Sequence, residues 1–81
     1  MDINYELYRV FYHVAASLSF SEASKQLFIS QSAVSQSIKV LEKKLGITLF
    51  IRSTKKVQLT PEGEILLRYV EPAVNLIQRC V

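Results

Sequence analysis

Hydrogen-bonding and basic side chains gather in the middle of this chain. Segment 25–56 holds seven basic residues and one acid, a net charge of +6, whereas the remaining residues carry −3. Ser and Gln side chains donate and accept hydrogen bonds, and Lys and Arg neutralise anions. This chemistry indicates a polyanionic partner, with nucleic acid favoured over a membrane surface. The alternative is an ordinary solvated lysine face.

Catalytic and metal-binding chemistry has little support in the sequence. The single histidine, His13, has no second candidate ligand beside it, and the serines lack a G-x-S-x-G motif. The single cysteine, Cys80, excludes an internal disulfide framework and a multi-thiolate metal site, and it is typical of a reducing compartment. We therefore expect a cytoplasmic protein that is not an enzyme and needs neither a metal nor a cofactor.

The composition predicts one small folded domain. With 81 residues the chain forms a single thin core, and 49% hydrophobic residues with only two glycines and two prolines argue against disorder. No apolar run approaches the roughly 18 residues of a membrane span. The N-terminal region, with Asp2 and Glu6, lacks the basic start of a signal peptide. We expect neither a membrane partner nor export.

Two helices are expected before residue 30. Apolar residues at three- and four-residue spacing form one stripe of a first helix that starts near Asn4. Ser19 and Glu22 form an S-x-x-E capping box, which predicts a second, short helix that turns Ala23 and Leu27 inward. The stripe of the first helix consists of Leu7, Val10, Phe11, Val14 and Leu18.

A third helix is expected from the N-cap Ser30 to Leu45, where Gly46 supplies a left-handed stop. At 100° per residue its side chains separate into two faces. The outer face carries no acid, and short hydrogen-bonding side chains occupy its N-terminal half. The apolar face holds Val34, Ile38, Leu41 and Leu45, and the outer face holds Ser32, Ser35, Gln36, Lys39 and Lys43.

A small hairpin and a fourth helix are expected after the third helix. Segments 49–52 and 57–59 are short β-prone runs on either side of a basic tip. Thr60 followed by Pro61 is an N-cap with proline at the first helical position. The helix that begins there is expected to reach nearly to the last residue, with a bend at Pro72.

The fourth helix carries an apolar pattern that predicts a partner helix. Its spacings of 4, 3, 4 and 3 residues are the rhythm of a two-helix seam, so we expect dimerisation with a second copy of the chain. The alternative is that part of the seam covers the domain's own core, for which Leu66 is the first candidate. The seam consists of Leu66, Val70, Ala73, Ile77 and Cys80.

The aromatic residues do not indicate a surface for single-stranded nucleic acid. A stacking platform needs aromatic rings exposed together on a basic sheet. We expect most of the rings here in the core or at its rim, because they follow helical spacing. They belong to Phe11, Phe20, Phe28, Phe50, Tyr5, Tyr8, Tyr12 and Tyr69.

These elements together predict a mainly α fold, a winged helix-turn-helix followed by a long linker helix. In this arrangement the third helix, about 31–45, enters the major groove of duplex DNA, and the wing, about 52–56, contacts the backbone or the minor groove. The alternative is a winged helix that binds another protein; the acid-free outer face and the basic wing favour DNA. The candidate contacts are Gln31, Ser32, Ser35, Gln36, Lys39, Lys43, Arg52, Lys55 and Lys56.

Five stretches resemble the N-terminal DNA-binding region of LysR-type transcriptional regulators, in one register from about Tyr5 to the end of the fourth helix. Ser32 stands where the family commonly has a proline, and it frees a backbone donor in the first turn of the recognition helix; Ser24, Ser37 and Glu62 are further departures. The stretches are SFSEA at 19–23, SQSAVSQSIK at 30–39, LEKKLG at 41–46, LFIR at 49–52 and LTPEG at 59–63.

The resemblance implies roles for single residues. Arg52 matches the family's wing arginine, Lys55 and Lys56 stand where wing bases are usual, and Lys39 would lie near the phosphates. A structural alternative for Arg52 is an ion pair with Glu42. The residues that would read or approach bases are Gln31, Ser32, Ser35 and Gln36.

The resemblance also implies a domain organisation. Residues 1–60 would be the DNA-binding domain, and residues 61–81 the linker helix through which two copies pair as a homodimer on an interrupted palindromic operator. We expect the effector-binding domain that family members usually carry to be absent from this chain. A small-molecule effector would then act only on a full-length protein.

Overall fold

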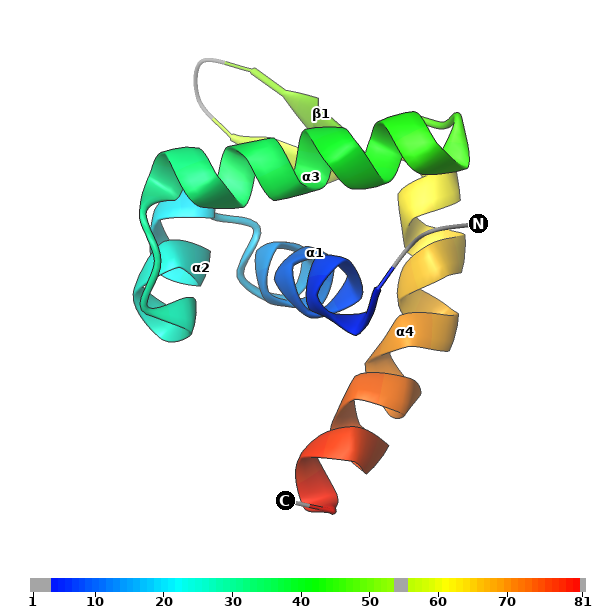
Figure 1. The fold of residues 1–81 in the computed structure, drawn as a ribbon. Coiled ribbons are helices and arrows are strands. Elements are labelled where there is room, and N and C mark those ends of the chain that lie inside the picture. The colour runs from blue at the N-terminus through cyan, green and yellow to red at the C-terminus, as the bar shows by residue number, and fades with distance from the viewer. Residues whose placement is uncertain (1–3, 54–55, 81) are drawn as a thin grey trace.

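The computed structural model describes residues 4–53 and 56–80. The expected order of three helices, a hairpin and a fourth helix is confirmed (Figure 1). Within the described residues no helix is both long and apolar enough to cross a membrane. The elements are α1 (Tyr5–Ser17), α2 (Phe20–Leu27), α3 (Gln31–Leu45), β1 (Phe50–Arg52), β2 (Val57–Leu59) and α4 (Pro61–Arg79).

Side-chain caps fix the start of each helix. The N-caps are Asn4, Ser19, Ser30 and Thr60, and the side-chain oxygen of each accepts a hydrogen bond from the backbone N–H three residues later, at 3.0 to 3.2 Å. Such a cap satisfies one of the donors that a helix N-terminus leaves without an intrahelical partner, and it stabilises a helix by about 1 kcal/mol. The helix starts expected from Ser19, Ser30 and Thr60 are confirmed.

The first three helices all end in the left-handed backbone region. Gly46 has a φ of 71°, as expected for the end of α3, but Leu18 and Phe28 also have positive φ angles, 52° and 58°. Such a residue leaves the helical path, so its side chain no longer follows the buried stripe. Leu18 is 45% exposed and Phe28 is 93% exposed. The expectations that Leu18 lies on the core stripe and Phe28 at the core or its rim are therefore wrong.

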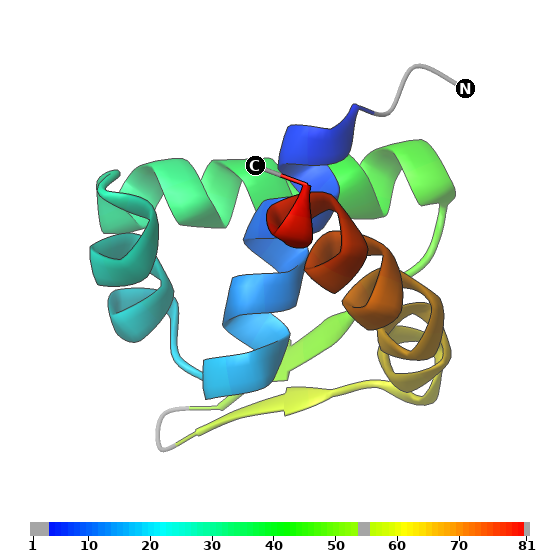
Figure 2. The ribbon, with the colours of Figure 1, turned by 90° about the horizontal axis from the view of Figure 1, so that it is seen from below.

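The core lies where α1 meets the other elements. Figure 2 shows α1 between α2 and α4, with α3 crossing behind it and the hairpin along one side. The apolar faces predicted for α1, α2 and α3 supply most of the buried side chains, and β1 and α4 complete the core. The core consists of Val10, Phe11, Val14, Ala15, Phe20, Ala23, Leu27, Val34, Ile38, Leu41, Leu49, Phe50, Val70 and Val74.

The hairpin is a two-stranded antiparallel sheet. Phe50 pairs with Leu59 and Arg52 pairs with Val57, so β1 begins one residue later than the expected run. Beyond the last pair, the backbone N–H of Ser53 donates to the carbonyl oxygen of Lys56 at 3.0 Å. The predicted wing residue Lys55 lies outside the described residues.

The fourth helix is attached to the strand region through its N-cap residue, Thr60. The Thr60 hydroxyl donates to the carbonyl oxygen of Thr48 at 2.6 Å. The Thr60 backbone N–H donates to the carbonyl oxygen of Leu49 at 3.0 Å. From there α4 continues through Pro72 and runs away from α3 (Figure 1). Because α4 supplies Val70 and Val74 to the core, it is also part of the packed domain. A functional division at residue 60 stays a prediction.

Candidate nucleic-acid interface

The two predicted faces of α3 are confirmed by burial. Val34, Ile38 and Leu41 are buried against α1 and α2, whereas the opposite face is open to solvent along the helix. Figure 1 shows α3 along one side of the molecule, with the hairpin projecting past it. On the open face Gln31, Ser32, Gln36, Lys39 and Lys43 are exposed and Ser35 is half-buried.

Arg52 joins the hairpin to α3. Its Nη2 atom donates to the Ser35 hydroxyl oxygen at 2.9 Å, and its guanidinium carbon lies 3.9 Å from the centre of the Phe20 ring. Neither a hydrogen bond nor a salt bridge joins Arg52 to Glu42 in the described part of the chain. The alternative of an Arg52–Glu42 ion pair is therefore wrong: the arginine lies at the opposite end of the short β1 strand from the residues that Glu42 binds.

Glu42 fastens the other end of β1 to α3. Its Oε2 atom accepts hydrogen bonds from the backbone N–H groups of Leu49, at 2.8 Å, and Phe50, at 3.3 Å. Glu42, the one acid in the basic segment 25–56, thus has a structural role. Together with Arg52 it attaches the hairpin to α3 at both ends of β1.

A shallow hollow lies between the hairpin, the N-terminus of α2 and the start of α3. Arg52 and Lys56 supply two positive charges from the hairpin, and Gln31 supplies an amide group from α3. Lys56 is exposed, so its charge is available to an anion at this position. The hollow is lined by Leu18, Ser19, Phe20, Ser21, Gln31, Arg52, Ser53, Lys56 and Val57.

His13 has a structural contact. Its Nδ1 atom lies 2.7 Å from the side-chain oxygen of Gln26, which links α1 to α2, and its ring packs edge-on against Tyr12 at 5.3 Å. Within residues 4–53 and 56–80, no three His, Cys, Asp or Glu side chains are grouped as metal ligands.

The predicted dimer seam on α4 is divided between the core and the surface. Ala73, Ile77 and Cys80 are exposed, but Val70 is buried in the domain's own core, so its assignment to the seam is wrong. Leu66 is half-buried and packs against the same core, as the alternative for this residue expected. Val70 is covered because α1 packs on the stripe of α4 that contains Val70 and Val74.

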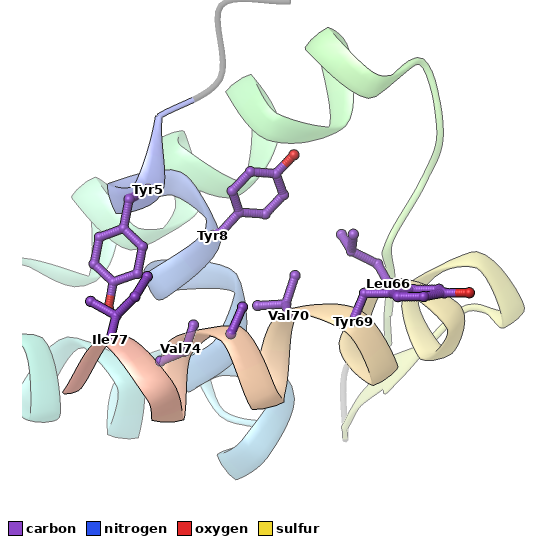
Figure 3. A pocket seen from close by; sticks show the side chains of 8 residues that line it. Tyr5, Tyr8, Leu66, Tyr69, Val70, Val74 and Ile77 are labelled. Atoms are coloured by element: carbon purple, nitrogen blue, oxygen red, sulfur yellow. The ribbon is translucent and has the colours of Figure 1, made fainter. Parts of the chain in front are cut away.

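A second apolar strip on α4 is exposed. Tyr69 is 74% exposed and Leu76 is 63% exposed, which corrects the expected place of Tyr69 in the core or at its rim. Beside this strip, an apolar groove runs between α1 and α4. Figure 3 shows the Tyr5 ring extending from α1 toward Ile77 of α4, whereas the Tyr8 ring points away from α4. The groove is lined by Tyr5, Tyr8, Leu66, Tyr69, Val70, Ala73, Val74 and Ile77.

The sequence analysis missed the roles of three residues in this region. Phe20 supports the guanidinium of Arg52, Glu42 binds the start of β1, and Leu76 belongs to the exposed strip. The isolated acid in the basic segment was a usable signal for Glu42, because a lone carboxylate among lysines suggests a specific partner. Phe20 and Leu76 carry no comparable signal, since their surroundings depend on how β1 and α1 pack.

The fold and this face define a winged helix-turn-helix protein, and the comparisons with known proteins identify its family. Residues 5–64 match the model of the bacterial regulatory helix-turn-helix proteins of the lysR family, and the chain belongs to that family. Among curated relatives, the HTH-type transcriptional regulator HdfR of Salmonella newport (strain SL254) is 41% identical over 73 residues, which are 90% of this chain and 26% of HdfR. The chain thus spans about a quarter of the length of such relatives.

Solved structures of similar shape include complexes with DNA. The DNA-binding domain of BenM in complex with catB site 1 DNA has a TM-score of 0.89 at 31% identity, over 96% of this chain and 88% of that one. The CbnR DNA-binding domain in complex with DNA has a TM-score of 0.86 at 27% identity, over 96% and 90%. Corynebacterium glutamicum OxyR, as its C206S mutant, has a TM-score of 0.88 at 36% identity, over 94% of this chain and 24% of OxyR.

Proposed function

We propose that this chain binds double-stranded DNA sequence-specifically, as the DNA-binding domain of a bacterial LysR-type transcriptional regulator. The observation that carries the proposal is the open, acid-free face of α3, to which the hairpin is attached through Arg52 and Ser35. The DNA complexes of the BenM and CbnR domains, which share this fold, support the same role. We further propose a cytoplasmic location, where chromosomal DNA lies, and no catalytic activity.

The proposed binding mode places α3 in the major groove, whose width admits one helix. Gln31, Ser32, Ser35 and Gln36 then face base edges, where hydroxyl and amide groups match the donors and acceptors of the bases. Lys39 and Lys43 lie farther along the same face and neutralise phosphates. The wing, with Arg52, Lys55 and Lys56, lies on the backbone or in the minor groove.

The phosphate role of α3 predicts a change in salt dependence. Lys39→Gln and Lys43→Gln should each weaken binding to every duplex. Each should also lower the steepness of log K against log salt by up to about one unit, because fewer counterions are released from the DNA when one phosphate contact is lost. Titrations at several KCl concentrations measure this slope. As a matched control, Arg79→Gln removes a positive charge at the far end of α4 and should leave the slope unchanged. Unchanged slopes for both lysine variants would favour a protein-binding module over DNA binding.

We also propose that two copies pair through α4. The support is the apolar surface that one copy leaves exposed on this helix, formed by Tyr69, Ala73, Leu76, Ile77 and Cys80. A second copy covers this surface and sets two α3 helices on successive turns of an interrupted palindrome. Any response to a small-molecule effector belongs to a longer protein that carries a sensing domain.

The pairing predicts an oligomeric state that one substitution changes. Ile77→Asp should raise the dimer dissociation constant more than tenfold, because it exchanges an apolar contact for a charge that loses water on association. Sedimentation equilibrium measures this constant. Gln78→Glu, which adds the same negative charge on the other side of α4, should leave it nearly unchanged. A wild type that is monomeric up to near-millimolar concentration, or an Ile77→Asp variant that dimerises equally well, would refute the pairing.

A further inference from the structure

We infer that Arg52 is a positioning residue that holds the Ser35 hydroxyl as a hydrogen-bond donor toward a base edge. The inference rests on the proposed DNA binding, and it concerns how one base pair is read. This positioning role differs from that of a wing arginine that only neutralises a phosphate. Its basis is the pair of contacts that Arg52 makes with Ser35 and Phe20.

The guanidinium of Arg52 lies on a rigid support. Phe20, the first residue of α2, is only 8% exposed, and its ring packs edge-on against Phe50 at 6.0 Å. A planar guanidinium stacks well on an aromatic face, so the ring limits the directions that the arginine can take. Arg52 therefore connects β1, α2 and α3 at one point, and Ser35 lies at the end of this connection.

The contact with Arg52 biases the hydrogen bonding of Ser35 toward donation. A guanidinium carries only donors, so the serine oxygen must accept from Arg52 at 2.9 Å. A serine hydroxyl has one hydrogen and two lone pairs, so Ser35 keeps its hydrogen and one lone pair for other partners. The cationic donor polarises the oxygen, which makes the O–H a stronger donor and the remaining lone pair a weaker acceptor. Because Ser35 is half-buried, its hydroxyl also has fewer directions open to it than that of an exposed serine.

A serine biased toward donation discriminates among bases. In the major groove, acceptors are N7 of the purines, O6 of guanine and O4 of thymine, whereas the amino groups of adenine and cytosine only donate. A hydroxyl without the bond from Arg52 would accept from those amino groups more readily. Because every base pair carries a purine N7, we expect Ser35 to favour a base pair that places an acceptor rather than an amino group at the position the hydroxyl faces, as long as Arg52 holds it.

The test compares base preference across variants. The probes are a duplex obtained by random-site selection with the wild-type domain, and a set in which each base pair is replaced in turn. Ser35→Ala should lose roughly fivefold to tenfold discrimination at one base pair, the value of one hydrogen bond. Arg52→Met removes the guanidinium donors but keeps an unbranched side chain about as long as the arginine stem, and it should lose the same discrimination at the same base pair. The double variant should lose no more than either single variant.

A matched control separates positioning from charge. Lys56→Met removes a positive charge from the same hollow without a contact to Ser35, so it should weaken binding to every duplex by one common factor. All binding is measured well below the thermal midpoint of each variant, so that only folded protein is compared. The inference would be overturned if Arg52→Met weakened binding to every duplex by one common factor, as Lys56→Met should. It would also be overturned if the effects of Arg52→Met and Ser35→Ala were additive. Wild-type protein that binds selected and scrambled duplexes equally would overturn the proposed function itself.

Discussion

Gly63→Ala is expected to destabilise the domain by about 3 kcal/mol, at the upper end of what overpacking a core usually costs. Gly63 is buried in the first turn of α4, against the strand region. A methyl group there would overlap the carbonyl oxygen of Leu49 and lie 2.9 Å from Cδ2 of Leu59. Alanine is the better helix former by about 1 kcal/mol, which offsets only part of this strain.

The strain at Gly63 has no easy relief, because the overlapping atom belongs to the backbone. The Leu49 carbonyl oxygen accepts the 3.0 Å hydrogen bond from the N–H of Thr60, so moving it also weakens the start of α4. Urea or guanidinium denaturation measures the free energy of unfolding. Gly46→Ala is the matched control: its Cβ meets nothing within 4 Å, and it should cost only about 1 kcal/mol for the left-handed backbone. A Gly63→Ala variant as stable as the wild type would contradict the packing of α4 on the strands.

Gln36→Ala is expected to weaken binding to the selected duplex by about 1–3 kcal/mol, roughly fivefold to 150-fold, while binding to a scrambled duplex changes little. An amide side chain can bind adenine through a donor and an acceptor at once, which contributes sequence preference and no charge. Gln36 is exposed on α3, and its side chain makes no hydrogen bond within the described residues, so the domain should melt at nearly the same temperature.

The measurement for Gln36→Ala is equilibrium binding to both duplexes at one salt concentration. Lys39→Gln serves as the contrasting variant, since the loss of a phosphate contact should reduce both affinities alike. Equal losses on the two duplexes for Gln36→Ala would place this residue away from the base edges. The comparison therefore tests which part of α3 reads sequence and which part only positions the helix.

Local sequence signals predicted the element order because they act over a few residues. Ser19, Ser30 and Thr60 each begin a helix by binding a backbone N–H three residues ahead, and Gly46 ends α3. The open face of α3 follows from helical periodicity alone, since one side of the helix must pack. These features need no knowledge of the tertiary structure.

Features that depend on packing between elements were not predictable in the same way. Phe28 continues a helical spacing, yet its left-handed backbone turns the ring into solvent. Val70 fits a dimer seam, but α1 takes up that stripe of α4. The partner of Arg52 depends on where β1 crosses α3, which brings residues 17 positions apart into contact.

The most direct test of sequence-specific DNA binding is the affinity of the domain for a duplex obtained by random-site selection, relative to a scrambled duplex of the same length and base composition. Both affinities are measured at the same, near-physiological salt concentration, because non-specific binding depends strongly on salt. The proposed reading of base edges by α3 predicts that the selected duplex binds tighter by roughly a thousandfold. Equal affinity for the two duplexes, or failure of the selection to enrich any sequence, would contradict it.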